Sequence, residues 1–317
     1  MAEIAPGSLG LGGANLGNLF APMTDDEATA LLGAAWDSGI RYFDTAPHYG
    51  LGLSERRLGR FLATRPRDEY VVSTKAGRLL EPSPATAGER DADLYDVPAD
   101  VRRVWDFSAD GVRRSLTESL ERLGLDRVDV LFLHDPEVAG LDDALATGVP
   151  AAVALREEGL VDAVGVGSTS TEALVAAARA GGLDLLMVAG RFTLLEQPAA
   201  AELLPECRAR GIGVVAAGVL NSGLLASPRP GDGARYEYQP VPADVLARAR
   251  RLADVCDGYG VELPVAALRF PWREETVRSV VLGAGSAAEL RETVRRARTP
   301  VPDALWAALA AQGMVAA

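Results

Sequence analysis

The sequence predicts an α/β fold and, within that class, a closed (β/α)8 barrel of the TIM type. Short apolar strands alternate with amphipathic helices along all 317 residues, a pattern typical of a parallel sheet with helical crossovers. Eight such units in a chain of this length suit a closed barrel, and a doubly wound open sheet is the alternative. The predicted strands are Leu9–Leu11, Arg41–Asp44, Tyr70–Lys75, Asp129–His134, Ala163–Gly167, Leu185–Val188, Gly213–Ala217 and Ser279–Leu282.

Capping signals mark the helices between these strands. Thr24 with Glu27 and Ser286 with Glu289 have the spacing of a capping box, in which a side chain at each position bonds the backbone of the other. Ser108 precedes a helix whose apolar residues form one stripe, and a glycine follows that helix, as expected at a helix end. No linker or change of composition divides the chain, so we expect residues 1–317 to form one domain.

One segment interrupts the alternation of strands and helices. Residues 78–106 show no clear period and carry three prolines and many charges. Loops of this length inside a compact domain are usually functional or disordered. Because the segment leaves the strand that ends at Lys75, we expect it to shape the substrate pocket and to close over that end of the barrel.

Composition and charge narrow the classes of protein. The chain is 48% hydrophobic and 24% charged, as a globular protein is, and its net charge is −12 with no basic block. That balance argues against nucleic acid or an anionic membrane as a partner. No signal peptide or long apolar run is evident, and Cys207 and Cys256 lie in helix-like segments. We therefore expect a cytoplasmic protein with reduced thiols.

Four ionisable residues lie at or just after the ends of three predicted strands: Asp44, Tyr49, Lys75 and His134. Each alone has an ordinary interpretation, as a helix cap, a loop anchor, a solvated strand end or a core histidine. Together they lie where a parallel barrel places its active site, at the carboxyl ends of the strands. The four residues therefore predict a catalytic site for proton transfer to carbonyl or alcohol oxygens.

The chemistry of such a site depends on the tyrosine. A free phenol has a pKa of about 10. An ammonium group about 4 Å away favours the phenolate by roughly 4 kcal/mol at an effective dielectric constant near 20, and burial opposes that effect. We expect Lys75 to lower the pKa of Tyr49 on balance, Asp44 to hold Lys75, and His134 to orient the substrate oxygen.

Other catalytic designs fit the sequence less well. The chain has only two histidines, His48 and His134, and no cysteine near them in sequence, so we expect no metal site. A GxSxG nucleophile motif is absent from the sequence. The glycines after the first strand have the wrong spacing for a dinucleotide-binding loop. We interpret Gly12 and Gly13 as positions where a ligand approaches the backbone closely.

Several runs together resemble the aldo-keto reductases, from about Leu9 to Thr293. The resemblance rests on FDTAPHYG, VVSTK, GRLL, VAGRFTLLEQ and DFSADGVRRSLTESLERLGLDRVDVLFLHDPE, and it is strongest to the branch that contains D-threo-aldose (L-fucose) 1-dehydrogenases and pyridoxal 4-dehydrogenase. It implies that Tyr49 is the general acid/base, assisted by Lys75, Asp44 and His134. It also implies a nicotinamide cofactor that lies extended across the mouth of the barrel.

The resemblance further implies a set of cofactor contacts, with some departures from the family pattern. Thr169, Ala189 and Ala217 stand where the family commonly has asparagine, glutamine and a stacking tyrosine. The run GVLNSGLL fits a loop whose backbone N–H groups bind a pyrophosphate. The implied cofactor-binding residues are Gly12, Gly13, Asp44, Ser168, Gly218, Leu220, Asn221, Gly223, Leu224, Gly283, Ala284, Gly285 and Glu289.

The end of the last predicted strand bears on the choice of cofactor. Gly283 and Ala284 replace the Lys-Ser of NADP-preferring members, and Glu289 replaces their arginine. A carboxylate there would repel a 2′-phosphate, although Glu289 also has an alternative role as a helix-capping partner. We therefore expect NAD as the cofactor, with NADP possible and Arg291 as the candidate for a phosphate contact.

Aromatic and imidazole residues are the candidates for the substrate pocket: Phe20, His48 and Trp105. They suit a small-molecule sugar or aldehyde. The expected reaction is the oxidation of an aldose at C1 to a lactone. The alternatives are turnover of another aldehyde or ketone, such as pyridoxal, and a cofactor-binding regulatory subunit with slow turnover. The sequence does not indicate an oligomeric state.

Overall fold

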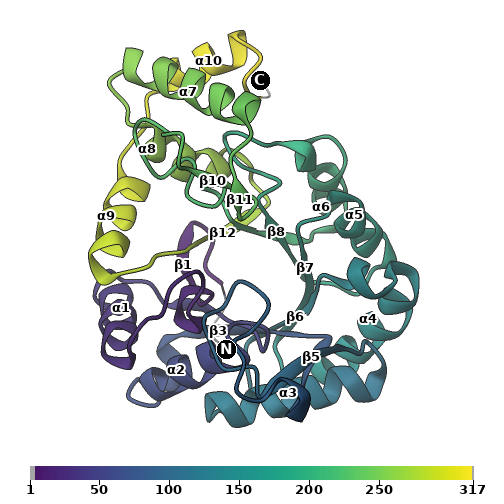
Figure 1. Cartoon of the computed structure of the whole chain (residues 1–317). Helices are drawn as coiled ribbons and strands as arrows, with labels where there is room; N and C mark the ends of the chain where they lie inside the picture. The colour runs from purple at the N-terminus through teal and green to yellow at the C-terminus, as the bar shows by residue number, and fades with distance from the viewer. Residues whose placement is uncertain (1–3, 316–317) are drawn as a thin grey trace.

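The computed structural model describes residues 4–315, and its centre is a closed barrel of parallel strands (Figure 1). β1 pairs with β2 on one side and with β12 on the other, which closes the ring. The eight predicted strands are confirmed, with each boundary within two residues of the prediction. The barrel strands are β1 (Ser8–Gly12), β2 (Tyr42–Asp44), β3 (Val71–Ala76), β6 (Val130–His134), β7 (Ala163–Ser168), β8 (Leu185–Ala189), β9 (Gly213–Ala217) and β12 (Val277–Leu282).

Helices surround the barrel, and α7 and α10 pack against each other at one side of it (Figure 1). None of the helices within residues 4–315 is long and apolar enough to cross a membrane. The α-helices are α1 (Asp25–Asp37), α2 (Leu53–Leu62), α3 (Ala109–Leu123), α4 (Leu141–Glu157), α5 (Thr171–Ala180), α6 (Leu203–Arg210), α7 (Ala243–Gly258), α8 (Leu263–Arg269), α9 (Ala287–Arg298) and α10 (Asp303–Ala311). Short 3-10 turns are η1 (Asn15–Gly17), η2 (Arg67–Glu69), η3 (Pro84–Thr86), η4 (Pro136–Ala139), η5 (Pro198–Ala200) and η6 (Phe270–Arg273).

The predicted helix caps are present, with one difference. Thr24 and Glu27 form a complete capping box at the start of α1. At α9, Ser286 accepts a bond from the backbone N–H of Glu289, as predicted. The carboxylate of Glu289, however, accepts from the N–H of Gly285 at 2.8 Å and not from that of Ser286. The carboxylate of Glu289 therefore stays at the end of β12.

Alternation of side chains along the strands decides which residues face the inside of the barrel. Large apolar side chains from six of the strands form one interior cluster near the start of the strands. On β2, β3 and β6, every second side chain after these apolar residues points to the same side of the strand, which is the inside of the barrel. The interior is thus apolar at its base and ionisable at its mouth. The inward series are Tyr42 and Asp44 on β2, Val71, Ser73 and Lys75 on β3, and Val130, Phe132 and His134 on β6.

The segment 78–106, predicted to lack regular structure, contains an antiparallel hairpin. Its strands are β4 (Arg78–Pro82) and β5 (Val101–Trp105). Both strands are short and carry charged residues, so they lack the alternating pattern that identifies a strand in the sequence. In the stretch that connects the two strands, the carbonyl of Leu94 accepts a hydrogen bond from the N–H of Phe20 at 2.9 Å. The segment is therefore fastened to the loop that follows β1.

A second small hairpin, which the sequence did not predict, follows β9. It consists of β10 (Arg235–Tyr236) and β11 (Gln239–Pro240), which are labelled between α8 and β12 in Figure 1. Its tip residues Glu237 and Tyr238 both have positive φ angles. The N–H of Tyr238 donates to Oγ of Ser222 at 3.2 Å. This bond joins the hairpin to the loop 218–225, where we expect the cofactor.

Candidate active site

The structure brings the four predicted catalytic side chains together at the mouth of the barrel. The ammonium group of Lys75 lies 2.6 Å from Oδ2 of Asp44 and 3.0 Å from the phenolic oxygen of Tyr49. It also donates to the carbonyl of Thr45 at 3.0 Å. An ammonium group has three donors, and here all three have acceptors. Lys75 is therefore held in one position, with Asp44 and Tyr49 on either side of it.

Tyr49 does not have the lowered pKa that the sequence led us to expect. Burial raises the pKa of this phenol well above its usual value, and the charge of Asp44 raises it further. The prediction was wrong because desolvation of the phenolate, together with the charge of Asp44, outweighs the attraction of Arg78. Since Lys75 donates to the phenolic oxygen, the hydroxyl hydrogen of Tyr49 is free to point towards another acceptor. In its neutral, protonated form Tyr49 is therefore a proton donor.

His134 and His48 border the phenol of Tyr49 as neutral imidazoles. Their ring centroids lie 5.7 Å apart, and each lies 6.0 Å from that of Tyr49. Burial, followed by the charge of Arg78, lowers the pKa of His134 well below its usual value and that of His48 to about 2. Among residues 4–315, neither Nδ1 atom has a hydrogen-bond partner. Each ring therefore keeps a buried nitrogen atom whose hydrogen-bonding capacity is unused within the described residues.

An ion pair that the sequence analysis missed lies beside His134. Arg78, the first residue of β4, pairs with Asp135, whose Oδ2 atom is 3.6 Å from Nε2 of His134. Burial raises the pKa of Asp135 to about 6. Arg78 follows the strand of Lys75 and Asp135 follows His134, but no local pattern indicates that the two residues pair.

The insertion supplies two further residues above the catalytic groups. The ring of Tyr95 lies 5.2 Å from that of His48 and 6.2 Å from that of Tyr49. Arg103 binds Asp91 at 2.7 Å and donates to the carbonyl of His48 at 3.2 Å. The insertion therefore covers the site. The sequence predicted the position of the insertion but not Tyr95 or Arg103 as residues of the site.

The three predicted substrate-pocket residues occupy different positions. His48 contacts the catalytic rings, as described above. Trp105 stacks on Phe107 at 6.2 Å and lies under the guanidinium of Arg78 at 4.3 Å. Phe20 is 41% exposed, and its ring lies 5.7 Å from that of Tyr238. Of the three, His48 is innermost, Trp105 backs the Arg78–Asp135 pair, and Phe20 is at the rim.

The predicted cofactor residues near the start of the chain have packing roles. The N–H of Gly13 donates to the carbonyl of Asp44 at 2.7 Å. A Cβ atom on Gly13 would lie 2.6 Å from Oγ of Ser54, and one on Gly12 would lie 3.1 Å from Val281. Gly13 is thus required by the protein's own packing, and close approach of a ligand is not needed to explain it.

The ends of β7 and β9 carry the central part of the predicted cofactor site. The hydroxyl of Ser168 donates to Glu137 and accepts from the N–H of Ser170. In the loop 218–225, four residues have positive φ angles, namely Gly218, Asn221, Ser222 and Gly223. The N–H groups of Asn221, Gly223 and Leu224 bond within this loop, which leaves fewer of the predicted donors for a ligand.

The same loop and the end of β12 carry small residues and one unpaired polar atom. Oδ1 of Asn221 is buried and has no hydrogen-bond partner within residues 4–315. Beyond β12, Gly283 and Gly285 are exposed, while Ala284 is buried. Within the same described part of the chain, no cluster of histidine, cysteine and acidic residues is placed to hold a metal ion. Small residues and a buried, unpaired amide oxygen therefore lie after β9 and β12, across the barrel from the candidate catalytic groups.

Comparisons with known proteins agree with this geometry. The model of the Aldo/keto reductase family matches residues 8–312. The chain is 54% identical to a D-threo-aldose 1-dehydrogenase from Pseudomonas sp., over 98% of this chain and 94% of that protein. It is 40% identical to a pyridoxal 4-dehydrogenase from Microbacterium luteolum, over 97% of this chain and 94% of that protein.

Solved structures support the fold alone, because their sequence identities are low. The aldo-keto reductase AKR11C1 from Bacillus halodurans, in its holo form, superposes with a TM-score of 0.77 at 22% identity, over 98% of this chain and 95% of that one. The glycerol dehydrogenase AKR11B4 from Gluconobacter oxydans gives a TM-score of 0.73 at 22% identity, over 96% and 90% of the two chains.

Proposed function

Because this chain belongs to the aldo/keto reductase family, we propose that it is a nicotinamide-dependent dehydrogenase that oxidises an aldose at C1 to the lactone. The observation that carries the proposal is the arrangement of Lys75, which is held by Asp44 and the carbonyl of Thr45 and donates its third N–H to the phenol of Tyr49 at the mouth of the barrel. The 54% identity to a D-threo-aldose 1-dehydrogenase supports the choice of an aldose.

Tyr49 is the group that moves the proton. In oxidation, its deprotonated oxygen takes the proton of the C1 hydroxyl, and in reduction its hydroxyl returns a proton to the carbonyl oxygen. A nicotinamide ring, when bound, accepts or supplies the hydride at C1. His134, as a neutral imidazole, hydrogen-bonds the same substrate oxygen and orients it. Lys75 stabilises the phenolate form through the N–H that it already donates to Tyr49.

The surroundings of the catalytic groups suit a polyhydroxylated substrate. Asp135 and Arg78 form a pair of opposite charges next to His134, and both side chains are partly exposed. A carboxylate and a guanidinium together offer acceptors and donors to neighbouring hydroxyl groups. Aromatic faces at His48 and Tyr95 also suit a planar ring, so the 4-aldehyde of pyridoxal is the second candidate substrate.

The cofactor site is proposed to extend from Ser168 through the loop 218–225 to the end of β12. There the carboxylate of Glu289 is held at the N–H of Gly285. A fixed negative charge at this position disfavours a 2′-phosphate, so we propose NAD as the preferred cofactor. The cytoplasm is the proposed location.

A panel of substrates tests this function. L-fucose and other aldoses, pyridoxal and short aldehydes are each combined with NAD or NADP in their oxidised or reduced forms, and absorbance of the reduced nicotinamide is followed. The proposal predicts the highest kcat/KM for an aldose with NAD, and a lactone as the product. A kcat/KM for pyridoxal tenfold above that of every aldose would replace the first candidate with the second. Binding of the cofactor without turnover of any member would favour a regulatory role.

A further inference from the structure

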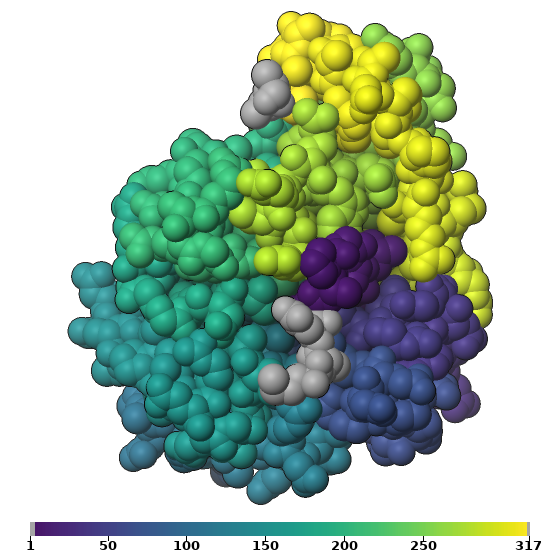
Figure 2. Space-filling view, turned by 180° about the vertical axis from the view of Figure 1, so that it is seen from behind, coloured from purple at the N-terminus to yellow at the C-terminus, as the bar shows by residue number. Residues whose placement is uncertain are grey.

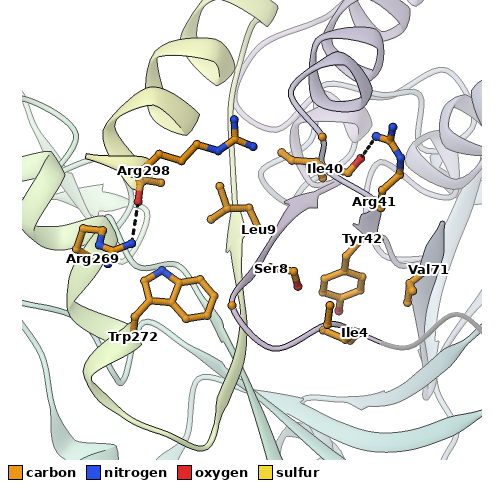
Figure 3. Close-up of a pocket in the computed structure, with 14 residues that line it drawn as sticks. Ile4, Ser8, Leu9, Ile40, Arg41, Tyr42, Val71, Arg269, Trp272 and Arg298 are labelled. Atoms are coloured by element: carbon orange, nitrogen blue, oxygen red, sulfur yellow. Dashed lines mark hydrogen bonds between the residues drawn. The ribbon is translucent and has the colours of Figure 1, made fainter. Parts of the chain in front are cut away.

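The barrel has a pocket of about 670 Å³ at the end opposite the catalytic groups (Figure 3). Figure 2 views the molecule from behind and shows the purple N-terminal residues between the violet segment that follows them and the yellow-green chain. Three arginines line the pocket, but each donates to a backbone carbonyl at the end of a helix or just beyond it. Such bonds satisfy carbonyls that helices leave unpaired. The three are Arg41, Arg269 and Arg298.

Tyr42 also lines this pocket, and its hydroxyl begins a chain of hydrogen bonds to the active site. Figure 3 shows its ring between Ser8, Ile4 and Val71. The hydroxyl of Tyr42 lies 2.9 Å from Oγ of Ser73. Further towards the mouth, Ser73 donates to Oδ1 of Asp44 at 2.7 Å. The other carboxylate oxygen, Oδ2, accepts from Lys75, which in turn donates to Tyr49.

The direction of these bonds is determined by the donors available. A serine hydroxyl has one hydrogen, and that of Ser73 is directed to Asp44. The bond between Tyr42 and Ser73 therefore has the phenol as its donor. The two oxygens of Asp44 are thus oriented by Ser73 from below and by Lys75 from above.

This chain of bonds is buried within the barrel. Tyr42, Ser73, Asp44 and Lys75 are each at most 3% exposed. Asp44 and Ser73 are register partners on adjacent strands, so the backbone fixes the distance between them. In such an environment a hydrogen bond to a charged group is stronger than in water, and an unpaired carboxylate oxygen is costly. Loss of the serine hydroxyl would leave Oδ1 without its side-chain donor.

We infer that Ser73 and Tyr42 are positioning residues for proton transfer at Tyr49, acting through the carboxylate of Asp44 and the ammonium group of Lys75. The inference rests on the proposed role of Tyr49. Ser73 orients the carboxylate, and Tyr42 orients the hydroxyl of Ser73. Neither touches the substrate. Removing the donor from Ser73 leaves more negative charge on Asp44, which disfavours the phenolate of Tyr49.

The test compares Ser73→Ala, Tyr42→Phe and the double variant. Ser73→Ala should lower kcat for oxidation about tenfold, the scale of one hydrogen bond to a charged group, with KM and the Kd for NAD changed less than about threefold. The rising limb of its pH–rate profile should move to higher pH. Tyr42→Phe should lower kcat about threefold. The double variant should be no slower than Ser73→Ala, because the two act in series.

Two further variants separate positioning from packing. Thr74→Val removes a buried hydroxyl on the same strand whose 2.7 Å bond goes to Glu55, on the side of the sheet away from the barrel interior. It should lower the melting temperature without moving the pH profile. Ser73→Thr keeps the hydroxyl and should retain most of kcat and the original pH profile. If Ser73→Ala does not fold, Tyr42→Phe, which removes the other donor of the chain of bonds, carries the test.

The outcomes distinguish this inference from the proposed function. If Tyr49→Phe keeps its turnover, the role of Tyr49 is wrong, and the inference that depends on it falls with it. If Tyr49→Phe is inactive while Ser73→Ala and Tyr42→Phe keep the wild-type kcat and pH profile, the role of Tyr49 stands and the positioning inference is wrong. Additive losses in the double variant would also contradict it, because Tyr42 would then act independently of Ser73.

Discussion

Replacing Lys75 with methionine should destabilise the protein strongly as well as inactivate it. The side chains of Lys75 and Asp44 are 2% and 3% exposed and lie 2.6 Å apart. Methionine keeps the length of the apolar chain but leaves the carboxylate buried without its cation. Breaking a buried pair in this way costs about 3–5 kcal/mol, so the free energy of unfolding should fall by that amount. The carbonyl of Thr45 and the phenolic oxygen of Tyr49 also lose a donor.

Urea denaturation at pH 7, followed by circular dichroism, measures the difference, provided that the unfolding transition is reversible and two-state. Arg60→Met is the matched control, because Arg60 and Asp25 form an ion pair at 2.8 Å with side chains 61% and 58% exposed. An exposed pair contributes at most about 1 kcal/mol. Adding Asp44→Asn to Lys75→Met should recover part of the loss, since it removes the unpaired charge. If Lys75→Met is no less stable than Arg60→Met, the account of the buried pair is wrong.

Three other expectations concern pH, the cofactor and the insertion. Burial raises the pKa of Tyr49, and oxidation needs the deprotonated form, so the oxidation rate should rise with pH above neutrality. The reduction rate should fall only at the pH at which the phenol ionises. An oxidation rate that is flat from about pH 6 to about pH 10 would contradict this expectation. The ratio of kcat/KM for NAD to that for NADP should exceed one and fall in Glu289→Gln; a tenfold preference for NADP would refute it and direct attention to Arg291. Replacing residues 81–103 with a Gly/Ser linker should leave a folded protein with lower kcat or higher KM and nearly unchanged NAD affinity, because the ring of Tyr95 is lost; unchanged kinetics would show that the insertion plays no part in the site.

The barrel, and the meeting of the four candidate catalytic residues at its mouth, could be predicted from the sequence for a geometrical reason. In a parallel barrel the carboxyl ends of all strands meet on one face. Residues two apart on a strand also point the same way, so Asp44, Lys75 and His134 were expected to face a common interior. The distances of 2.6 Å and 3.0 Å around Lys75 agree with that expectation.

The surroundings of the four residues could not be predicted in the same way. Arg78 and Asp135 are far apart in the sequence, and nothing local to either residue indicates their pairing. Tyr95 reaches the site because the insertion folds back onto the loop after β1. Burial of the phenol determines the direction of the pKa shift at Tyr49. The sequence argument gave the cation beside the phenol more weight than burial, and it therefore predicted the wrong direction for the pKa shift.

Turnover of the Tyr49→Phe variant tests the central claim most directly, because this change removes one oxygen atom and leaves the ring in place. Measured on the best aldose with saturating NAD, kcat should fall by at least about 10²-fold, as expected for the loss of a positioned acid/base. The Kd for NAD, measured separately by fluorescence or calorimetry, should stay within a few-fold of the wild-type value. A variant with near-normal kcat would contradict the assignment of Tyr49 as the proton-transfer group and, with it, the mechanism proposed for this barrel.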